Sequence, residues 1–444
     1  MNDPWIHDGD SEFLINRDIY RDPAVFELEM KFIFERTWSL VGLESQVAKP
    51  HDFFTGHIGR APIVVTRDGG GALHCLLNTC RHKGAMVCHL QHGNSRHFVC
   101  RYHGWAYNSG GANIYVKDHD TGAYNESFDS KNHDLQAVAR FASYRGVLFA
   151  SLRADVPDLE AHLGDARKMI DLVADQSPHG MECIPGRGAF IYKGNWKLQM
   201  ENGVDPYHFS STHPSYIAAL QRRTDKTSVY SSFKSSELQR GTFAFENGHN
   251  AMWGPAPSDK ATPLSFMRDE LVARNGETKA RWMTYVRNTT IFPNAQFAEN
   301  ASLQLRIWRP LAVDRTAMVT YCVAPIGEPA EARRMRIRQY EEFFNPTGLA
   351  TPDDIANYED CQRGFEARPV VWQQGSSRGE RLKGRCDDHE SLGELGVRPV
   401  STVVGSFDLG DETVLHPTYR HWLSLITEGF AGERAAASTV NASA

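Results

Sequence analysis

Two short elements that each combine a cysteine with a histidine constrain this chain more than any other feature of its sequence. The first is Cys80-Arg81-His82, and the second, seventeen residues later, is Cys100-Arg101-Tyr102-His103. Each element offers one thiolate and one imidazole, and both groups are common ligands of transition metals. If the two elements form facing loops, the cysteines can meet on one metal ion and the histidines on another. The fold must therefore bring two loop tips together in this part of the chain.

The order of these ligands indicates which metal group they hold. Two thiolates and two imidazoles are the ligand set of a Rieske-type [2Fe–2S] cluster, which Cys80, Cys100, His82 and His103 would bind. A structural zinc site is the alternative, but such sites usually pair cysteine with cysteine and histidine with histidine. Six neighbours lack the spacing and are interpreted as solvated histidines and core cysteines: His74, His89, His92, His97, Cys75 and Cys88.

Composition excludes several other classes of protein. The chain has 444 residues, and 48 lysines and arginines against 54 acidic residues give a net charge of −6. This balance provides no polycationic surface, so we expect neither nucleic acid nor a membrane as a partner. The first residues are acidic where a signal peptide would be basic, and no apolar run is long enough to span a bilayer. We expect a cytoplasmic protein whose eight cysteines are thiols or metal ligands.

Hydrophobic patterning divides the chain into four regions. Residues 1–38 are predicted to be an N-terminal helical segment that packs on the larger domain, and residues 39–155 a small β-rich domain that contains both cysteine and histidine elements. Residues 156–430 mix strands with helices, and residues 431–444, rich in alanine and serine, are expected to be disordered. The predicted fold class is α+β, with a small all-β domain inserted in or preceding a larger α+β domain whose antiparallel sheet is flanked by helices.

Individual elements can also be predicted. Helical spacing covers residues 22–38, and Gly69-Gly70-Gly71 predicts a hairpin turn between two strands. Residues 304–311 and 317–323 are strand candidates, and residues 331–344 are a strong helix candidate. The sequence has no Walker loop and no Gly-x-Gly-x-x-Gly, so the chain is not expected to bind its own nucleotide.

A second group of ligand-type residues lies in the segment 195–213. Asn202, Asp205 and His208 would share one face of a helix, whereas His213 would be displaced by roughly 140° on an ideal helix. Both histidines can reach one metal ion only if the helix widens or breaks between them. Pro214 supports a break, because the residue before a proline is disfavoured in the α region.

Two histidines need a third ligand to form the 2-His-1-carboxylate set that leaves positions open on Fe(II) for chemistry with O₂. Asp353 and Asp354 lie far along the chain at a predicted helix start, where N-capping of the helix is an equally good interpretation. Asp205 is placed to accept the second N–H of His208 and so to orient that ligand, with a solvated helix charge as its alternative.

Together the two constellations resemble the large (alpha) subunit of the Rieske non-haem iron aromatic-ring-hydroxylating oxygenases, over roughly residues 15–430. The segments 17–23, 194–199 and 351–354 look most like the benzoate, anthranilate and 2-halobenzoate dioxygenase branch. The resemblance implies one [2Fe–2S] cluster per subunit, with Cys80 and Cys100 on one iron and His82 and His103 on the other. It also implies one mononuclear Fe(II) bound by three residues: His208, His213 and Asp354.

The same resemblance implies an assembly and partners. Asp205 would bridge His208 and the cluster ligand His103 of a neighbouring subunit, within a trimer of alpha subunits that usually carries three small beta subunits. A reductase that uses NADH, flavin and iron–sulfur would supply electrons. Arg101 departs from the family, since many relatives have proline there, but it removes no ligand.

The implied activity is the addition of both atoms of O₂ to adjacent ring carbons of an aromatic acid or amine, giving a cis-diol or a catechol. Two rivals remain open: a salicylate-type monohydroxylase on the same scaffold, and a non-enzymatic electron-transfer or zinc protein. Arg287 or Arg306 could pair with a substrate carboxylate, with buried ion pairing or surface exposure as the alternative. Further candidates for the substrate pocket are apolar or amide side chains: Met252, Trp253, Phe292, Asn294, Phe297 and Trp308.

Overall fold

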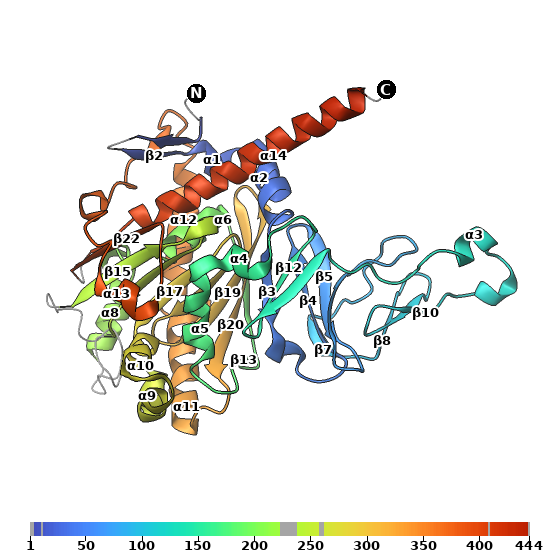
Figure 1. Cartoon of the computed structure of the whole chain (residues 1–444), viewed down its shortest axis with the longest axis horizontal. Helices are drawn as coiled ribbons and strands as arrows, with labels where there is room; N and C mark the ends of the chain where they lie inside the picture. The colour runs from blue at the N-terminus through green and yellow to red at the C-terminus, as the bar shows by residue number, and fades with distance from the viewer. Residues whose placement is uncertain (1–3, 10–11, 223–237, 257–261, 407–408, 443–444) are drawn as a thin grey trace. The chain divides into compact units, whose positions relative to one another are not determined.

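The computed structural model describes residues 4–9, 12–222, 238–256, 262–406 and 409–442. The chain divides into two compact units (Figure 1). The smaller unit is Phe34–Leu159, and the larger unit joins Met1–Ile33 to Glu160–Ala444. In the sequence, therefore, the smaller unit is inserted between two parts of the larger one.

The smaller unit is built from three antiparallel sheets, in agreement with the predicted all-β domain. The four-stranded sheet has the order β6 (Leu73–Leu77), β5 (Ala61–Arg67), β4 (Asp52–Ile58) and β7 (His92–Asn94). A three-stranded sheet has the order β10 (Asn113–Tyr115), β9 (Ala106–Asn108) and β8 (His97–Val99). The other has the order β11 (Arg140–Tyr144), β12 (Val147–Ser151) and β3 (Ser39–Leu43).

Strand β5 shows why this unit has a core on both sides of its main sheet. Ile63 and Val65 pack into one hydrophobic cluster and Val64 into another, because successive side chains of a strand point to opposite faces. The predicted hairpin between β5 and β6 is confirmed, and the Gly71 N–H closes its turn on the Asp68 carbonyl at 3.1 Å. Cys75 and Cys88 are buried in these two clusters, as expected of core cysteines.

The larger unit is organised around one antiparallel sheet in which β14 (Gly188–Tyr192) pairs with β20 beside the main path. The main path runs β13 (Met181–Cys183), β20 (Arg315–Pro325), β19 (Leu303–Ala312), β18 (Ala295–Glu299), β17 (Val286–Ile291), β16 (Asn250–Gly254), β15 (Gln239–Ala244) and β22 (Ser401–Ser406). Figure 1 shows the helices of this unit flanking the sheet. The two predicted strands, 304–311 and 317–323, are confirmed as the paired strands β19 and β20.

The flanking helices differ widely in length. Those of eight residues or more in the described ranges are α5 (Arg167–Ala174), α8 (Pro214–Gln221), α9 (Arg268–Asn275), α10 (Glu277–Thr284), α11 (Ala330–Gln339), α12 (Thr351–Gly364) and α14 (His416–Ala442). The helix predicted over 331–344 is confirmed, and its last turn, Tyr340–Phe344, is π-helical. No helix in the described ranges is long and apolar enough to cross a membrane.

The prediction of a helical segment over residues 1–38 is wrong in part, because β1 (Ile6–Asp8) and β2 (Phe13–Asn16) are strands and the helical turns end at Phe34. The segment belongs to the larger unit, and its helix α2 (Pro23–Glu29) is capped by Asp22 and followed by a π-helical turn. The Glu29 carboxylate is fully buried and lies 2.5 Å from the Lys197 ammonium. Glu29 also accepts the indole N–H groups of Trp196 and Trp422, both at 2.9 Å. A buried ion pair needs such extra hydrogen bonds to offset its loss of water, so this contact fixes where α2 sits.

One expectation about the chain's end is wrong. The sequence predicts disorder for residues 431–444, but α14 continues to Ala442. Alanine has the highest helix propensity of all residues, so an alanine-rich sequence favours continuation of the helix that begins at His416.

Candidate metal centres

In the smaller unit, two loops with the same backbone geometry carry the cysteine and histidine elements. In the first loop the Cys80 N–H donates to the carbonyl five residues later at 2.8 Å, and the Gly84 N–H returns to the Cys80 carbonyl at 3.0 Å. In the second loop Cys100 and Gly104 make the same two bonds, at 2.8 and 2.9 Å. Both glycines have a positive φ, 77° and 73°, which suits glycine better than any other residue. A glycine four residues after each cysteine is a signal that our sequence reasoning missed.

These loops bring the predicted cluster ligands together. The imidazole rings of His82 and His103 lie 4.4 Å apart, and the thiols of Cys80 and Cys100 are both buried. The Cys80 sulfur is also 3.2 Å from the hydroxyl of Tyr107. Burial, and then the neighbouring Cys100, raise the pKa of the Cys80 thiol. The two rings and the two thiols therefore lie as two pairs on two matching loops of the smaller unit.

One orphaned atom supports a metal group at this place. The His82 Nδ1 is buried and, among the residues that the structure describes, has no hydrogen-bond partner. The ring is held by stacking on Trp105, with centroids 5.2 Å apart and planes at 9°. Leaving such an atom unpaired costs about 1–3 kcal/mol, and ligation of iron would remove that cost. The residues present therefore fit a Rieske-type cluster.

The second site lies in the larger unit, where the structure corrects one detail of the sequence interpretation. Helix α6 (Trp196–Asn202) ends at Asn202, so Asp205 and His208 do not continue it. Pro206 explains the early end, because proline lacks an N–H and disfavours the α region in the residue before it. His208 and His213 then flank the short helix α7 (Phe209–Thr212), and Pro214 begins α8 (Pro214–Gln221). Of the two options, widening or a break, the chain takes the break.

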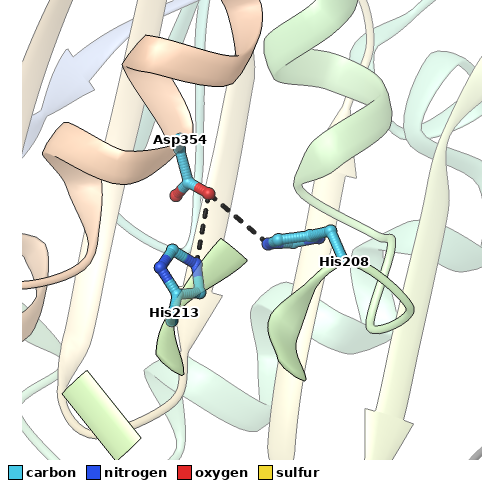
Figure 2. A group of neighbouring side chains, drawn as sticks. All are labelled: His208, His213 and Asp354. Atoms are coloured by element: carbon cyan, nitrogen blue, oxygen red, sulfur yellow. Dashed lines mark ion pairs between the residues drawn. The ribbon is translucent and has the colours of Figure 1, made fainter. Parts of the chain in front are cut away.

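This break lets both histidines face one carboxylate from α12. The Asp354 Oδ1 is 3.4 Å from His208 Nε2 and 3.2 Å from His213 Nε2 (Figure 2). One ligand atom from each of the three residues lies within 4.8 Å of the other two. The three residues therefore offer two nitrogens and one oxygen to a single ion, which is the 2-His-1-carboxylate set.

Each histidine is oriented by a second carboxylate. The His208 Nδ1–H donates to Asp205 Oδ2 at 3.2 Å, and the His213 Nδ1–H donates to Asp353 Oδ2 at 3.3 Å. A carboxylate at Nδ1 keeps a proton on that nitrogen, so Nε2 is the atom through which each ring can bind a metal once its own proton is displaced. The expected contact of Asp205 with His208 is present, whereas the matching contact of Asp353 with His213 could not be predicted from the sequence. Helix α12 is not capped by either aspartate, since its N-cap is Ala350 without a side-chain bond.

Asn202 completes the group at the metal site. Its Nδ2 donates to Asp354 Oδ1 at 3.3 Å and is 3.2 Å from His208 Nε2. Burial raises the pKa of Asp354, but hydrogen bonds and charge from both histidines outweigh burial and lower it. The carboxylate is therefore ionised at neutral pH, as a metal ligand must be. Burial lowers the pKa of His208, but its bonds to Asp205 and Asp354 raise it to about 10.

A cavity of about 270 Å³ opens beside these residues and is lined by His208, His213 and Asp354. Of the predicted pocket residues, Met252, Trp253 and Arg306 line it. Four others, Phe292, Asn294, Phe297 and Trp308, are buried elsewhere. Phe297 is an example. Asn288, which lines the cavity, pairs with Ala298 across strands β17 and β18, so Phe297, the next residue along β18, faces the other side of the sheet.

The arginines of the larger unit differ from expectation. Arg287 does not reach the cavity, because its guanidinium is fully buried against Glu299 at 2.5 Å. Arg306 lines the cavity, with its Nε and Nη1 donating to Gln304 and Gln296. The sequence did not single out Arg240 or Arg378, which also line the cavity. No periodicity marks them, because they come from β15 and from a loop far along the chain.

Comparison with known proteins decides the family. The family described as "Ring hydroxylating alpha subunit (catalytic domain)" matches residues 160–388, and the "Rieske [2Fe-2S] domain" matches residues 37–128. The chain belongs to the ring-hydroxylating alpha subunits. It is an aromatic ring-hydroxylating dioxygenase alpha subunit, with a Rieske [2Fe-2S] domain and the mononuclear iron site typical of the family. The zinc-protein and electron-carrier alternatives are therefore wrong.

Three relatives of this oxygenase match along nearly their whole length. Toluate 1,2-dioxygenase subunit alpha of Pseudomonas putida is 43% identical over 95% of this chain and 93% of its own. The 2-halobenzoate 1,2-dioxygenase large subunit of Burkholderia cepacia is 38% identical over 98% and 92%. The anthranilate 1,2-dioxygenase large subunit of Acinetobacter baylyi is 38% identical over 95% and 91%. The oxygenase is thus of the benzoate and anthranilate type.

A solved structure confirms the fold class. Naphthalene 1,2-dioxygenase with indole bound in its active site superimposes with a TM-score of 0.79 and 26% identity. The match covers 93% of this chain and 92% of that one.

Proposed function

We propose that this oxygenase adds both atoms of O₂ to adjacent ring carbons of an aromatic carboxylic acid, of the kind of benzoate or its methyl, amino and halogen derivatives. The product is a cis-diol, which collapses to a catechol where an amine or halide occupies the attacked carbon. The amine then leaves as ammonia or the halogen as halide ion, and a carboxyl group on the other attacked carbon leaves as CO₂. The names of the three relatives, with toluate, 2-halobenzoate and anthranilate as substrates, point to the same class.

The observation that carries the choice of an acid is the charge of the cavity. Three arginines line it: Arg240, Arg306 and Arg378. The two aspartates in the lining, Asp205 and Asp354, both contact His208. A guanidinium offers paired N–H donors that match the two oxygens of a carboxylate. The cavity therefore suits an apolar ring that bears one negative group.

The metal ligands follow from the two centres. We assign the cluster to Cys80, Cys100, His82 and His103, and the mononuclear iron to His208, His213 and Asp354. When bound, the cluster supplies electrons and the iron supplies the open positions at which O₂ reacts. The chain's own residues hold the ligands in place: Asp205 and Asp353 fix the tautomers of the two histidines, and Asn202 donates to the ligand carboxylate.

Partners are part of the proposal. We assign to this chain a small beta subunit, a trimer of alpha subunits and a reductase that takes electrons from NADH through flavin and iron–sulfur. The names of the relatives, which call them alpha or large subunits, support a second kind of subunit. Within the trimer, Asp205 would link His208 to the cluster ligand His103 of a neighbouring subunit and so shorten the path of the electrons.

The deciding experiment is a substrate panel under ¹⁸O₂ with a surrogate reductase. Benzoate, anthranilate, 2-halobenzoates, salicylate and aniline are compared for product formed per O₂ consumed. We expect two labelled oxygens in the diol formed from benzoate. A single labelled oxygen would mean that the enzyme is a monohydroxylase. A preference for aniline over the acids would contradict the proposal that the substrate carries a carboxylate.

The arginines are tested in the same assay. Arg240, Arg306 and Arg378 are replaced singly by glutamine, and KM is measured for benzoate and for uncharged benzamide. A hydrogen bond to a charged group contributes about 1.5–3 kcal/mol, so the responsible variant should raise the KM for benzoate by roughly 10–100-fold. The KM for benzamide serves as the control and should change little. Equal changes for both compounds in all three variants would contradict the proposal.

A further inference from the structure

A second, much smaller cavity lies in the larger unit against the proposed iron ligand Asp354. Its volume is about 10 Å³, on the order of the ~10–15 Å³ that one water molecule requires. Asp354 and Arg306 line both this cavity and the large one, so they form the wall between the two. The cavity is further lined by Gln199 from α6, by Gln304 and Thr320 from the sheet, and by Tyr358 from α12.

Two side chains in this lining have polar atoms without a partner. The Nε2 of Gln199 and the hydroxyl of Tyr358 are buried and, in the part of the chain that the structure describes, make no hydrogen bond. The residues are only 4% and 5% exposed. Buried polar groups are paired with protein or with ordered water in the great majority of cases, so two orphaned groups around one cavity point to a bound water.

The water would also have an acceptor. His208, His213 and Asn202 all contact the same carboxylate oxygen of Asp354, Oδ1, and Figure 2 shows both ion pairs meeting there. Those contacts leave the second oxygen to other donors. Tyr358 follows Asp354 by four residues on α12, so the two side chains share one helix face. One water can therefore reach both.

We propose that this cavity binds one ordered water, held by Gln199 and Tyr358, that donates a hydrogen bond to the second oxygen of Asp354. The water restrains rotation of the carboxylate, so that Oδ1 stays directed at His208 and His213. Gln199 and Tyr358 are thus positioning residues that act on the iron ligand without touching substrate. This inference rests on the proposed role of Asp354 as a ligand.

The first test is structural. A crystal structure of the full-length oxygenase at a resolution that shows ordered solvent should contain one water within hydrogen-bond distance of Gln199 Nε2, Tyr358 Oη and Asp354. Tyr358→Phe and Gln199→Met each remove a partner while they keep the volume of the side chain, and we expect the water to be lost in both. A cavity without water in the unmodified protein would overturn the proposal.

The second test measures iron affinity. Loss of a group that orients a metal ligand typically weakens metal binding by 10–100-fold, so Tyr358→Phe should raise the Kd for Fe(II) by about tenfold or more. The matched control is Tyr192→Phe, because Tyr192 is fully buried and lies 5.2 Å from Tyr358 ring to ring. Its hydroxyl bonds to the Asn195 carbonyl, to Thr316 and to the backbone of Gln199, and not to the Gln199 side chain that would hold the water. The control should bind Fe(II) as the unmodified protein does, and the [2Fe–2S] absorption should be unchanged in both variants.

The two possible failures can be told apart. If Tyr358→Phe binds Fe(II) as tightly as Tyr192→Phe, the water has no positioning role and this inference is wrong. If His208→Ala and Asp354→Asn keep the mononuclear iron, the ligand assignment itself is wrong, whatever Tyr358 does. Gln199→Met provides a second variant should Tyr358→Phe fold poorly.

Discussion

The two metal centres are built in different ways. The cluster site uses two loops of the same backbone shape, 80–85 and 100–105, and each loop is closed by its own hydrogen bonds. The iron site joins residues that are 140 and 152 positions apart, through the contacts of His213 with Asp353 and of Asn202 with Asp354. The first geometry is local and repeats as a pattern in the sequence. The geometry of the iron site depends on how α12 packs against α6 and α7. This packing leaves no repeated motif in the sequence.

Removing a metal ligand should have the largest effect, because the metal group itself is lost. It also tests whether the two centres are independent. His208→Ala should leave about two irons per chain, both in the cluster, and abolish turnover, since one ligand of three is gone. Cys80→Ser should abolish the visible absorption and the EPR signal of the reduced cluster. Iron analysis and spectroscopy measure both results. An iron content near two per chain in the unmodified protein, unchanged in His208→Ala, would show that the larger unit holds no separate iron.

Asp205→Asn should have the next largest effect. The substitution keeps the shape of the side chain but removes the charge that orients His208, and it removes the proposed link to a neighbouring cluster. We expect both irons and the assembly to persist while turnover falls by roughly 10–100-fold or more. Single-turnover electron transfer from the reduced cluster measures the step directly. Asp205→Glu is the comparison, and full activity of Asp205→Asn would remove the bridging role.

Substitutions at two glycines distinguish a steric clash with a neighbouring side chain from strain in the backbone of a loop. An added Cβ at Gly203 would lie 1.8 Å from the Gln296 amide, which is buried and cannot move away. Gly203→Ala should therefore cost about 1–3 kcal/mol or more and lower iron occupancy. At Gly104 the nearest side-chain atom would be 3.8 Å away, so Gly104→Ala suffers only from its φ of 73°. That strain costs ~1–2 kcal/mol and should affect the cluster alone.

Thermal unfolding and metal content measure this difference. Gly203→Ala should lose mononuclear iron and keep its Rieske spectrum, whereas Gly104→Ala should show the reverse. Loss of both metal groups in either variant would mean that the two centres do not fold independently.

The smallest expected effect concerns buried histidines of the larger unit. Burial lowers the pKa of His249 and of His421 to about 4, against about 6.5 in the unfolded chain. Between these values the unfolded state binds more protons, so stability is lost as pH falls from about 6.5 to 4. The loss per histidine is at most ~1.4 kcal/mol per pH unit.

The measurement is thermal unfolding between pH 6.5 and 4.5, followed by tryptophan fluorescence. Burial also lowers the pKa of His162 and of His416 in this unit. His421→Gln therefore removes one of four such histidines among the described residues and should reduce the pH dependence by about a quarter. Parallel curves for the variant and the unmodified protein would show that His421 does not carry the effect.

The sequence by itself determined the proposed cluster site almost completely. Cys80, His82, Cys100 and His103 could be named as its proposed ligands because loops that bind a cluster need few residues and fixed spacings, and these are visible along the chain. The all-β character of the smaller unit, the hairpin at Gly71 and the paired strands β19 and β20 also follow from local periodicity. Arg240 and Arg378 could not be found in this way, because residues that line a pocket do not recur at a regular spacing in the sequence.

The tertiary structure decided the rest. From the sequence, Asp353 and Asp354 could equally well cap a helix or bind a metal. The packing of α12 directs Asp354 at both histidines and Asp353 at Nδ1 of His213. The same packing buried Arg287 against Glu299 and left Arg306 in the cavity, although both arginines look alike in sequence. Contacts between residues more than a hundred positions apart depend on burial and charge in the folded protein. They leave no local pattern in the sequence from which they could be predicted.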